Sequence, residues 1–283
     1  MSFVETAHTF GPQKILFGIL SKPAQVHPKA RDLCVVFFNA GLLHRVGPYR
    51  TYVEWARELA EMGITSFRFD LSGLGESDSR DSTLPEMERA VLDTKDAFDF
   101  LGREFGLKRM VSIGLCSGAD QAHDVGVADA RLVGAVMMDG PGYPNAQYKL
   151  KHYASKVTRL QSWKTAAKLA TQKLTSSSVS EVGGDREETF ERVFRPQEQI
   201  QDEIVAMAQR GTELLYLYTG GVFYYFNHAS QFDENFPKAK ANVPGSRVEL
   251  EYYEGSGHTY TDPRDRKVMK ERVNRWLKQK FLG

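Results

Sequence analysis

The stretch from Val111 to Ala119 constrains the fold of this chain most, because an apolar run breaks at Gly114 and a helical pattern resumes after Gly118. Cys116 lies midway between the two glycines. This spacing predicts a sharp turn from a strand into a helix, whose central residue has a strained backbone and presents its side chain above the edge of a sheet. Glycine is needed on both sides because a Cβ atom would collide where strand and helix approach each other. We therefore expect a nucleophile elbow centred on Cys116.

Strand patterns alternate with amphipathic helical patterns along most of the chain. Predicted strands occupy residues 32–38, 64–70, 109–115, 132–139, 213–218 and 248–253. Several are continuous apolar runs, which are typical of strands covered on both faces. Apolar residues recur at spacings of three and four in the intervening helical segments, as over residues 49–62. The alternation predicts an α/β fold with a mostly parallel sheet flanked by helices, and residues 3–21 add an antiparallel pair at its edge.

Further segments, in their order along the chain, resemble motifs of the α/β-hydrolase superfamily. Residues 39–42 read Asn-Ala-Gly-Leu, where that superfamily has an oxyanion loop, and residues 68–77 resemble its signature Arg-x-Asp-x-x-Gly-x-Gly-x-Ser. Residues 255–258 read Gly-Ser-Gly-His after a late strand, where the superfamily has its catalytic histidine. The resemblance covers nearly the whole chain and implies an α/β-hydrolase fold. A cysteine at the nucleophile position is similar to the dienelactone hydrolase branch.

The resemblance implies that Cys116 is the nucleophile and His258 its base. The helix that begins after Cys116 directs free backbone amides at the sulfur and favours its thiolate. His258 would deprotonate this thiol and later protonate the leaving group. The alternative for Cys116 is an inert small residue in a fold whose activity has been lost.

The acid of the catalytic set is harder to assign. The superfamily places an Asp or Glu after the strand at residues 214–218, but the chain reads Thr-Gly-Gly-Val-Phe at residues 219–223. Asp139, at the carboxyl end of the preceding strand, is the first substitute, and Asp233 and Glu234 come next. A Cys-His pair without an acid is also open, since a cysteine rests as a thiolate beside an imidazolium.

The oxyanion and the substrate would be bound by residues beside the elbow. The resemblance implies the Ser117 amide as one oxyanion donor and the amide of Gly41 or Leu42 as the other. His44 and Arg45 lie in the same loop and are candidates for contacts with substrate. Arg45 would receive a substrate carboxylate or phosphate, or else form an ion pair that anchors the loop.

Asn39, Asp70 and Ser77 belong to the matched motifs but are expected to be structural. Asn39 replaces the superfamily's usual histidine and would brace the oxyanion loop. Asp70 and Ser77 are expected to hold a turn.

The alternation of strands and helices predicts a division into two parts. Residues 1–140 and 211–283 form the α/β-hydrolase core, and residues 141–210, about 70 residues without a clear strand, form a helical cap or lid because they are too long for a plain connection. The first half of the cap is basic and contains Lys149, Lys151, Lys156, Arg159, Lys164, Lys168 and Lys173. This segment is either a solvated face or a surface that attracts an acyl-carrier protein or the phosphates of a coenzyme A thioester.

Composition limits the partners and the compartment. A net charge of +1 with a pI near 7.8 argues against a general role in binding nucleic acid or a membrane surface. The N-terminus carries no signal peptide pattern and no apolar run approaches the length of a membrane span. The two cysteines, Cys34 and Cys116, suit a reducing compartment, so a cytoplasmic location is predicted. No metal-binding spacing or phosphate-binding loop is visible, and no cofactor is expected.

These patterns together predict a cysteine-dependent enzyme acting on ester or thioester bonds. An acyl group on Cys116 would be released to water, as in a thioesterase-like hydrolase, or to an acceptor, as in an acyltransferase. The alternative is a non-catalytic ligand-binding or scaffold protein that retains the fold, which the missing acid would support.

Overall fold

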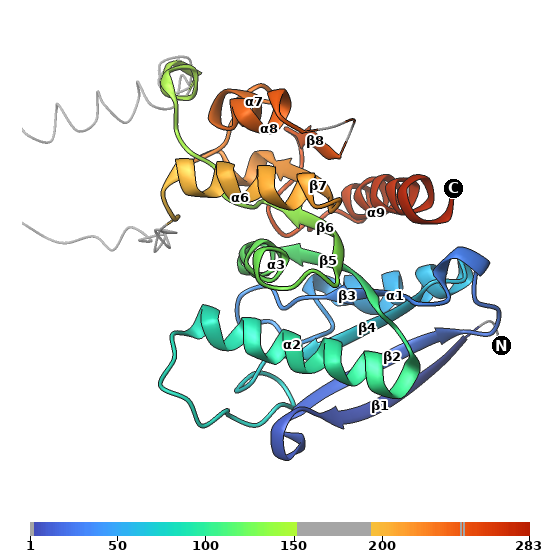
Figure 1. Cartoon of the computed structure of the whole chain (residues 1–283). Coiled ribbons are helices and arrows are strands. Elements are labelled where there is room, and N and C mark those ends of the chain that lie inside the picture. The colour runs from blue at the N-terminus through green and yellow to red at the C-terminus, as the bar shows by residue number, and fades with distance from the viewer. Residues whose placement is uncertain (1–2, 152–193, 244, 246) are drawn as a thin grey trace, which may run out of the picture.

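The computed structural model describes residues 3–151, 194–243, 245 and 247–283 (Figure 1). The strands in these residues form one eight-stranded sheet of order β1-β2-β4-β3-β5-β6-β7-β8. Their bounds are β1 Phe3–Phe10, β2 Leu16–Pro23, β3 Leu33–Phe37, β4 Thr65–Asp70, β5 Arg109–Leu115, β6 Leu132–Met138, β7 Glu213–Thr219 and β8 Val248–Tyr253.

The direction of the strands confirms the predicted fold class. β1 pairs with β2, and β2 with β4, in antiparallel fashion, so the N-terminal hairpin lies at one edge of the sheet. From β4 to β8 the order is β4, β3, β5, β6, β7 and β8, and each adjacent pair in this series is parallel. The carboxyl ends of β3, β5, β6, β7 and β8 therefore meet at the same edge, where the topology of such sheets puts ligands.

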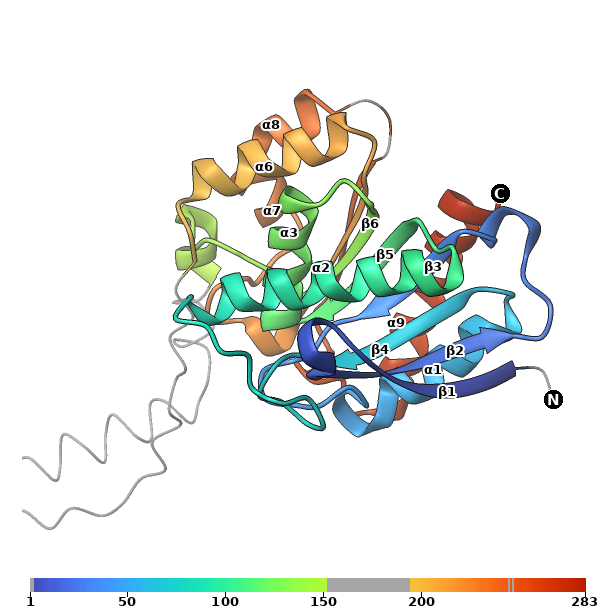
Figure 2. The same ribbon diagram turned by 60° about the horizontal axis from the view of Figure 1, so that its bottom comes forward.

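Helices cover both faces of the sheet (Figures 1 and 2). Helices α1 (Thr51–Glu61) and α9 (Pro263–Leu277) pack their apolar side chains into the cluster on one face. Helices α2 (Glu86–Phe105), α3 (Ser117–Ala128), α6 (Gln197–Gln209), α7 (Gln231–Asn235) and α8 (Pro237–Ala241) contribute to the cluster on the other face. No helix in the described ranges is long and apolar enough to cross a membrane.

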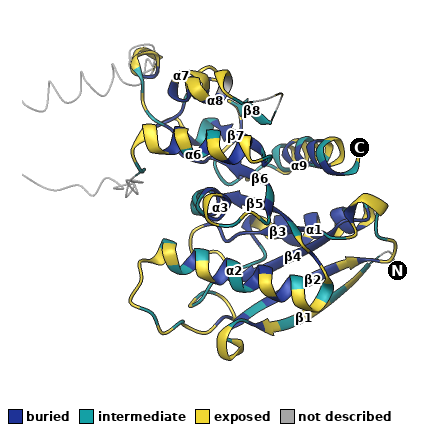
Figure 3. Ribbon diagram, in the orientation of Figure 1, coloured by how far each residue is buried: buried dark blue, intermediate teal, exposed yellow. Residues whose placement is uncertain are grey.

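Burial follows from this layering (Figure 3). Every residue of β3 and β4 is buried, as expected for strands between two helical layers. Trp55 of α1 and Trp276 of α9 are fully buried, and the Trp55 indole donates to the Asn274 side chain at 2.8 Å. These contacts fix α1 against α9 and hold the first and last parts of the chain together.

The predicted cap is described only in part. Helix α6 falls within the predicted cap range, and its Ile200, Ile204 and Met207 lie in the same apolar cluster as side chains of α3 and of the sheet. Residues 152–193 lie outside the described residues. Most of the predicted cap range and of its basic segment fall there, so the division at residues 141–210 stays a prediction.

Candidate active site

The turn at Cys116 has the geometry expected of a nucleophile elbow. Cys116 has φ 59° and ψ −119°, a conformation that costs energy in a residue with a Cβ atom. A Cβ at Gly114 would overlap the Gly118 carbonyl, and a Cβ at Gly118 would press on the Asn39 carbonyl. The two glycines therefore allow α3 to pack directly against β5 and the end of β3, which leaves the Cys116 side chain half-buried.

A glycine-to-alanine substitution tests this close packing. We expect Gly114→Ala to lower the free energy of unfolding by about 3 kcal/mol or more, because backbone must move to admit the new methyl group. Gly102→Ala in α2 is the matched control, since the nearest atom to its new Cβ would be 3.5 Å away, and it should be neutral or slightly stabilising. Denaturant unfolding measures both. Equal stability of the two variants would contradict the close packing.

The register of the sheet brings Asp139 beside Cys116. Leu115 pairs with Met138 in the parallel strands β5 and β6, so Cys116 and Asp139 both follow the ends of neighbouring strands. The Cys116 amide donates to the Met138 carbonyl at 3.0 Å. Asp139 itself is fully buried and has φ 51°, a second strained position at the same edge.

His258 reaches the same edge from the loop after β8. Its Nδ1 lies 2.6 Å from Oδ2 of Asp139, and its side chain also hydrogen-bonds to Cys116. The loop approaches closely because residues 220 and 221 are glycines. A Cβ at Gly220 would overlap the Glu254 carbonyl, and one at Gly221 would overlap the His258 backbone nitrogen. The glycine pair, where the superfamily's acid was expected, thus leaves room for the histidine loop.

Thr219 holds the Asp139 carboxylate in place, a role that the sequence reasoning missed. The Thr219 amide donates to Oδ1 of Asp139 at 2.7 Å, and its hydroxyl donates to Oδ2 at 2.8 Å. With His258 these donors satisfy the carboxylate, which a buried charge requires. The signal available in the sequence was the position of Thr219, at the carboxyl end of the strand after Asp139.

The alternative acids lie in other surroundings. Glu234 accepts hydrogen bonds from Asn145 and from Ser230. Asp233 lines a pocket together with Val248 and other residues of that region. Of the three candidate acids, Asp139 is the one that the structure brings to His258.

The surroundings of His258 change its acidity. Burial lowers the pKa of His258, but the hydrogen bonds and charges of Asp139 and Cys116 outweigh burial and raise it from 6.5 to about 9. Protonation of His258 therefore stabilises the fold. By linkage this stabilisation is fully present below about pH 6.5 and is lost as the pH rises through about 9.

The pKa of His258 can be measured directly by NMR titration of its ring carbons, assigned with a His258→Gln variant. We expect a value of about 9 in the wild type. Cys116→Ala and Asp139→Asn should each lower it, because each removes a hydrogen-bond partner and a negative charge. Cys34→Ala, which changes a fully buried side chain of β3, is the control and should leave it unchanged. A wild-type titration at or below pH 6.5 would contradict the described pairing.

Side-chain hydrogen bonds hold the loop after β3, for which an oxyanion role was predicted. The Asn39 amide group donates to the Leu43 carbonyl at 2.9 Å, and its oxygen accepts from the Leu71 amide at 3.1 Å. Ser77 donates to the Asp70 carbonyl at 2.7 Å. The structural roles predicted for Asn39, Asp70 and Ser77 are confirmed by these contacts.

Arg45 forms the ion pair that anchors its loop. Its guanidinium lies 2.5 Å from the buried Asp70 carboxylate, also pairs with Glu76, and stacks over the Phe17 ring at 4.5 Å. The Arg45 amide donates to Asp70 at 2.6 Å as well. Of the two roles predicted for Arg45, these contacts favour the anchoring ion pair, and contact with a substrate anion stays a prediction.

The remaining predicted residues lie at the edge where Cys116 lies. Leu42 and His44 are exposed in the loop after β3, and the role of His44 toward substrate stays a prediction. Gly41 adopts φ 56° and its amide donates to the Ser117 hydroxyl at 2.8 Å. Ser117 begins α3, so its own amide is one of the free donors of that helix.

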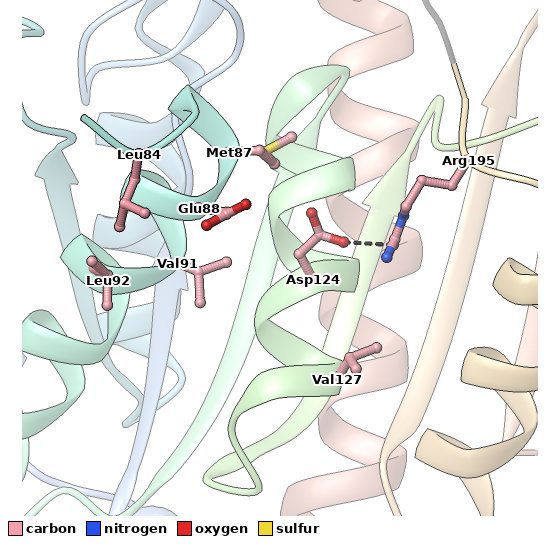
Figure 4. A pocket seen from close by; sticks show the side chains of 8 residues that line it. All are labelled: Leu84, Met87, Glu88, Val91, Leu92, Asp124, Val127 and Arg195. Carbon is pink, nitrogen blue, oxygen red and sulfur yellow. Dashed lines mark hydrogen bonds and ion pairs between the residues drawn. The ribbon is translucent and has the colours of Figure 1, made fainter. Parts of the chain in front are cut away.

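A separate pocket lies between α2 and α3, in the region where Asp124 pairs with Arg195 at 2.5 Å (Figure 4). Its volume is about 350 Å³. It is lined by Leu84, Met87, Glu88, Val91, Leu92, Asp124, Val127 and Arg195. Cys116, His258 and Asp139 are not among these residues. Within the described ranges, no group of three or more His, Cys, Asp or Glu side chains could hold a metal ion.

Comparison with known proteins bears on the family and the fold. A family model described as serine aminopeptidase, S33, matches residues 35–206. No curated protein matches the chain. Similar solved structures include an esterase from Pyrococcus furiosus, with 17% identity and a TM-score of 0.62. The match covers 100% of this chain and 92% of the esterase chain.

Two further solved structures are similar over nearly the whole chain. A cold-adapted esterase from an Arctic intertidal metagenomic library has 15% identity and a TM-score of 0.57, covering 99% of this chain and 95% of its own. A protein assigned as a dienelactone hydrolase from Klebsiella pneumoniae has 13% identity and a TM-score of 0.56, covering 99% and 100%. At these identities the likeness shows the fold alone, which is the α/β-hydrolase fold.

Proposed function

Because the chain belongs to the serine aminopeptidase S33 family, we propose that it is a cysteine-dependent hydrolase that cleaves an ester or a thioester through an acyl-Cys116 intermediate. One observation carries the proposal: His258 hydrogen-bonds to the half-buried Cys116 and, through Nδ1, to the fully buried Asp139 at 2.6 Å. With a raised pKa, His258 is protonated at neutral pH and supports a thiolate on Cys116.

Acylation begins when the Cys116 thiolate attacks the carbonyl carbon of the substrate. A carbon–sulfur bond forms and the carbonyl oxygen becomes an oxyanion, which the Ser117 amide and the amide of Gly41 or Leu42 would stabilise. The intermediate collapses, the bond to the leaving alkoxide or thiolate breaks, and that group takes the proton from Nε2 of His258. Asp139 stabilises the imidazolium and keeps Nδ1 protonated.

Deacylation reverses these roles. Water attacks the acyl carbon while the now neutral His258 removes its proton, and the carbon–sulfur bond breaks to release the acid and restore the thiolate. An amine or thiol acceptor would take the acyl group in the same way, which would make the enzyme an acyltransferase. An acyl-carrier protein or a coenzyme A thioester as donor remains part of the proposal, with the exposed Lys149 and Lys151 as the described residues of the basic segment.

The chemistry of sulfur favours esters and thioesters over amides. A thiolate leaves a tetrahedral intermediate more easily than an amine does, unless that amine is protonated well. Attack on an amide would therefore tend to revert. The family's name includes a peptidase activity, but the cysteine at position 116 argues against carrying that activity over to this chain.

Exposed apolar side chains support an apolar acyl group. Leu42 and Leu43 follow β3, and Phe223 and Tyr224 follow β7, with exposed fractions of 44% to 84%. Both loops lie at the edge where Cys116 lies, and the second begins beside the His258 loop. Four large apolar side chains are thus exposed in loops at this edge, where an apolar acyl group could contact them.

A panel of acyl esters, acyl thioesters and matched amides tests the proposal by steady-state turnover. We expect cleavage of esters and thioesters, faster for apolar acyl chains than for acetyl, with little turnover of amides. Adding an amine or a thiol to the same assays and identifying the products separates transfer from hydrolysis. Turnover confined to amides would contradict the proposal.

The non-catalytic alternative rested on the missing acid. A carboxylate now lies at His258, so that observation no longer favours a binding or scaffold protein.

A further inference from the structure

The hydroxyl of Ser117 accepts a hydrogen bond from a candidate oxyanion donor. The amide of Gly41, a candidate oxyanion donor, donates to Oγ of Ser117 at 2.8 Å. Donors of an oxyanion hole lie about 2.7 to 3.1 Å from the oxygen they stabilise. The Gly41 amide thus already donates to an oxygen atom of the chain, and the distance between its nitrogen and that oxygen is typical of an oxyanion-hole donor.

The backbone amide and the side-chain hydroxyl of Ser117 are both able to donate a hydrogen bond to a substrate. Among the described residues there is no acceptor for the hydrogen of the Ser117 hydroxyl, nor one for its amide. A hydroxyl carries one donor and two acceptor positions, so accepting from Gly41 leaves its hydrogen free to donate. The amide and the hydroxyl of a single serine are close enough for one oxygen atom to accept from both.

We propose that the Ser117 hydroxyl is a catalytic donor to the oxyanion of the acyl-Cys116 reaction, polarised by the Gly41 amide. In this arrangement the Gly41 N–H donates to Oγ and not directly to the oxyanion, and the Oγ–H donates to the oxyanion beside the Ser117 amide. Hydrogen bonds in such a chain strengthen one another. This inference rests on the proposed function, since it assigns a role within that reaction.

The opposite reading gives the hydroxyl an inhibitory role. Substrate would have to displace it from the Gly41 amide, and its removal would then free that amide and raise the rate. The two readings differ in sign, which makes a substitution decisive.

The experiment compares kcat and KM of Ser117→Ala, Ser117→Gly and Ser117→Thr on the best ester of the panel. We expect Ser117→Ala and Ser117→Gly to lower kcat by about 10- to 100-fold, with KM changed by less than about 3-fold. The loss should be smaller than the loss of an oxyanion donor that nothing replaces, because the Gly41 amide would then be free to donate to the oxyanion. Thr keeps the hydroxyl and should retain kcat within about 3-fold. Ser230→Ala, which removes an exposed hydroxyl bonded to Glu234, is the matched control.

A Cys116→Ala variant in the same series distinguishes a failure of this inference from a failure of the proposed function on which it rests. Wild-type or higher kcat in both Ser117→Ala and Ser117→Gly, with Cys116→Ala inactive, overturns the donor role and leaves the proposed function standing. Equal rates for Cys116→Ala and the wild type overturn both. A loss in Ala and Gly that Thr does not rescue also overturns the donor role, because it points to packing instead of the hydroxyl.

Discussion

Replacing Cys116 by alanine is expected to lower kcat/KM by about 10⁴-fold or more, because the reaction loses the atom that carries the acyl group. The hydrogen-bonded chain from Cys116 through His258 to Asp139 would remain in part, but it would have no thiol to deprotonate. Steady-state kinetics on an ester and on a thioester of the same acyl group measures the loss.

Cys34→Ala is the matched control, because Cys34 is the other cysteine of the chain and is fully buried in β3. Burial raises the pKa of the Cys34 thiol well above its ordinary range, so it does not compete as a nucleophile. This variant should keep wild-type kcat/KM. A Cys116→Ala enzyme within about tenfold of the wild type would refute the role of Cys116.

Substituting Asp139 by asparagine is expected to lower kcat by about 10²- to 10³-fold. An asparagine keeps the shape but presents an amide to His258, which then carries its proton on the wrong nitrogen to serve Cys116. The loss should be smaller than the loss in a serine enzyme, because a thiol ionises more easily than a hydroxyl. The same change should lower the pKa of His258, whose raised value depends on Asp139.

Two substitutions at the rejected acids serve as controls. Asp233→Asn and Glu234→Gln change the acids that the sequence also proposed, and both should stay within about threefold of the wild-type kcat. If either costs as much as Asp139→Asn, or if Asp139→Asn costs almost nothing, the assignment of the acid is wrong.

The sheet and the elbow could be predicted because their causes are local. A strand buried on both faces reads as a short apolar run, and a turn too tight for a Cβ atom reads as a glycine on each side of Cys116. In both cases the physical constraint acts on residues adjacent in the sequence. His258 was proposed differently, from the resemblance to the α/β-hydrolase superfamily, which has its histidine in the loop after the last strand.

The partners across the sheet edge were harder to predict because they depend on register and loop packing. Asp139 reaches His258 only because β6 lies between β5 and β7, and because Gly221 admits the histidine loop. The hydrogen bond from Gly41 to Ser117 joins residues 76 positions apart, and no pattern of residue spacing predicts it. The sequence left open whether Arg45 contacts substrate or anchors its loop, because its partner Asp70 lies 25 positions away.

Intact-mass analysis after mixing the protein with acyl esters and acyl thioesters near neutral pH tests the central claim most directly. The account predicts that the wild type gains the mass of the acyl group, while Cys116→Ala gains nothing. It also predicts a Cys116 thiol that alkylates faster than free cysteine, because His258 favours the thiolate. An absence of adduct with every donor, together with a thiol no more reactive than free cysteine, would contradict the acyl-enzyme mechanism.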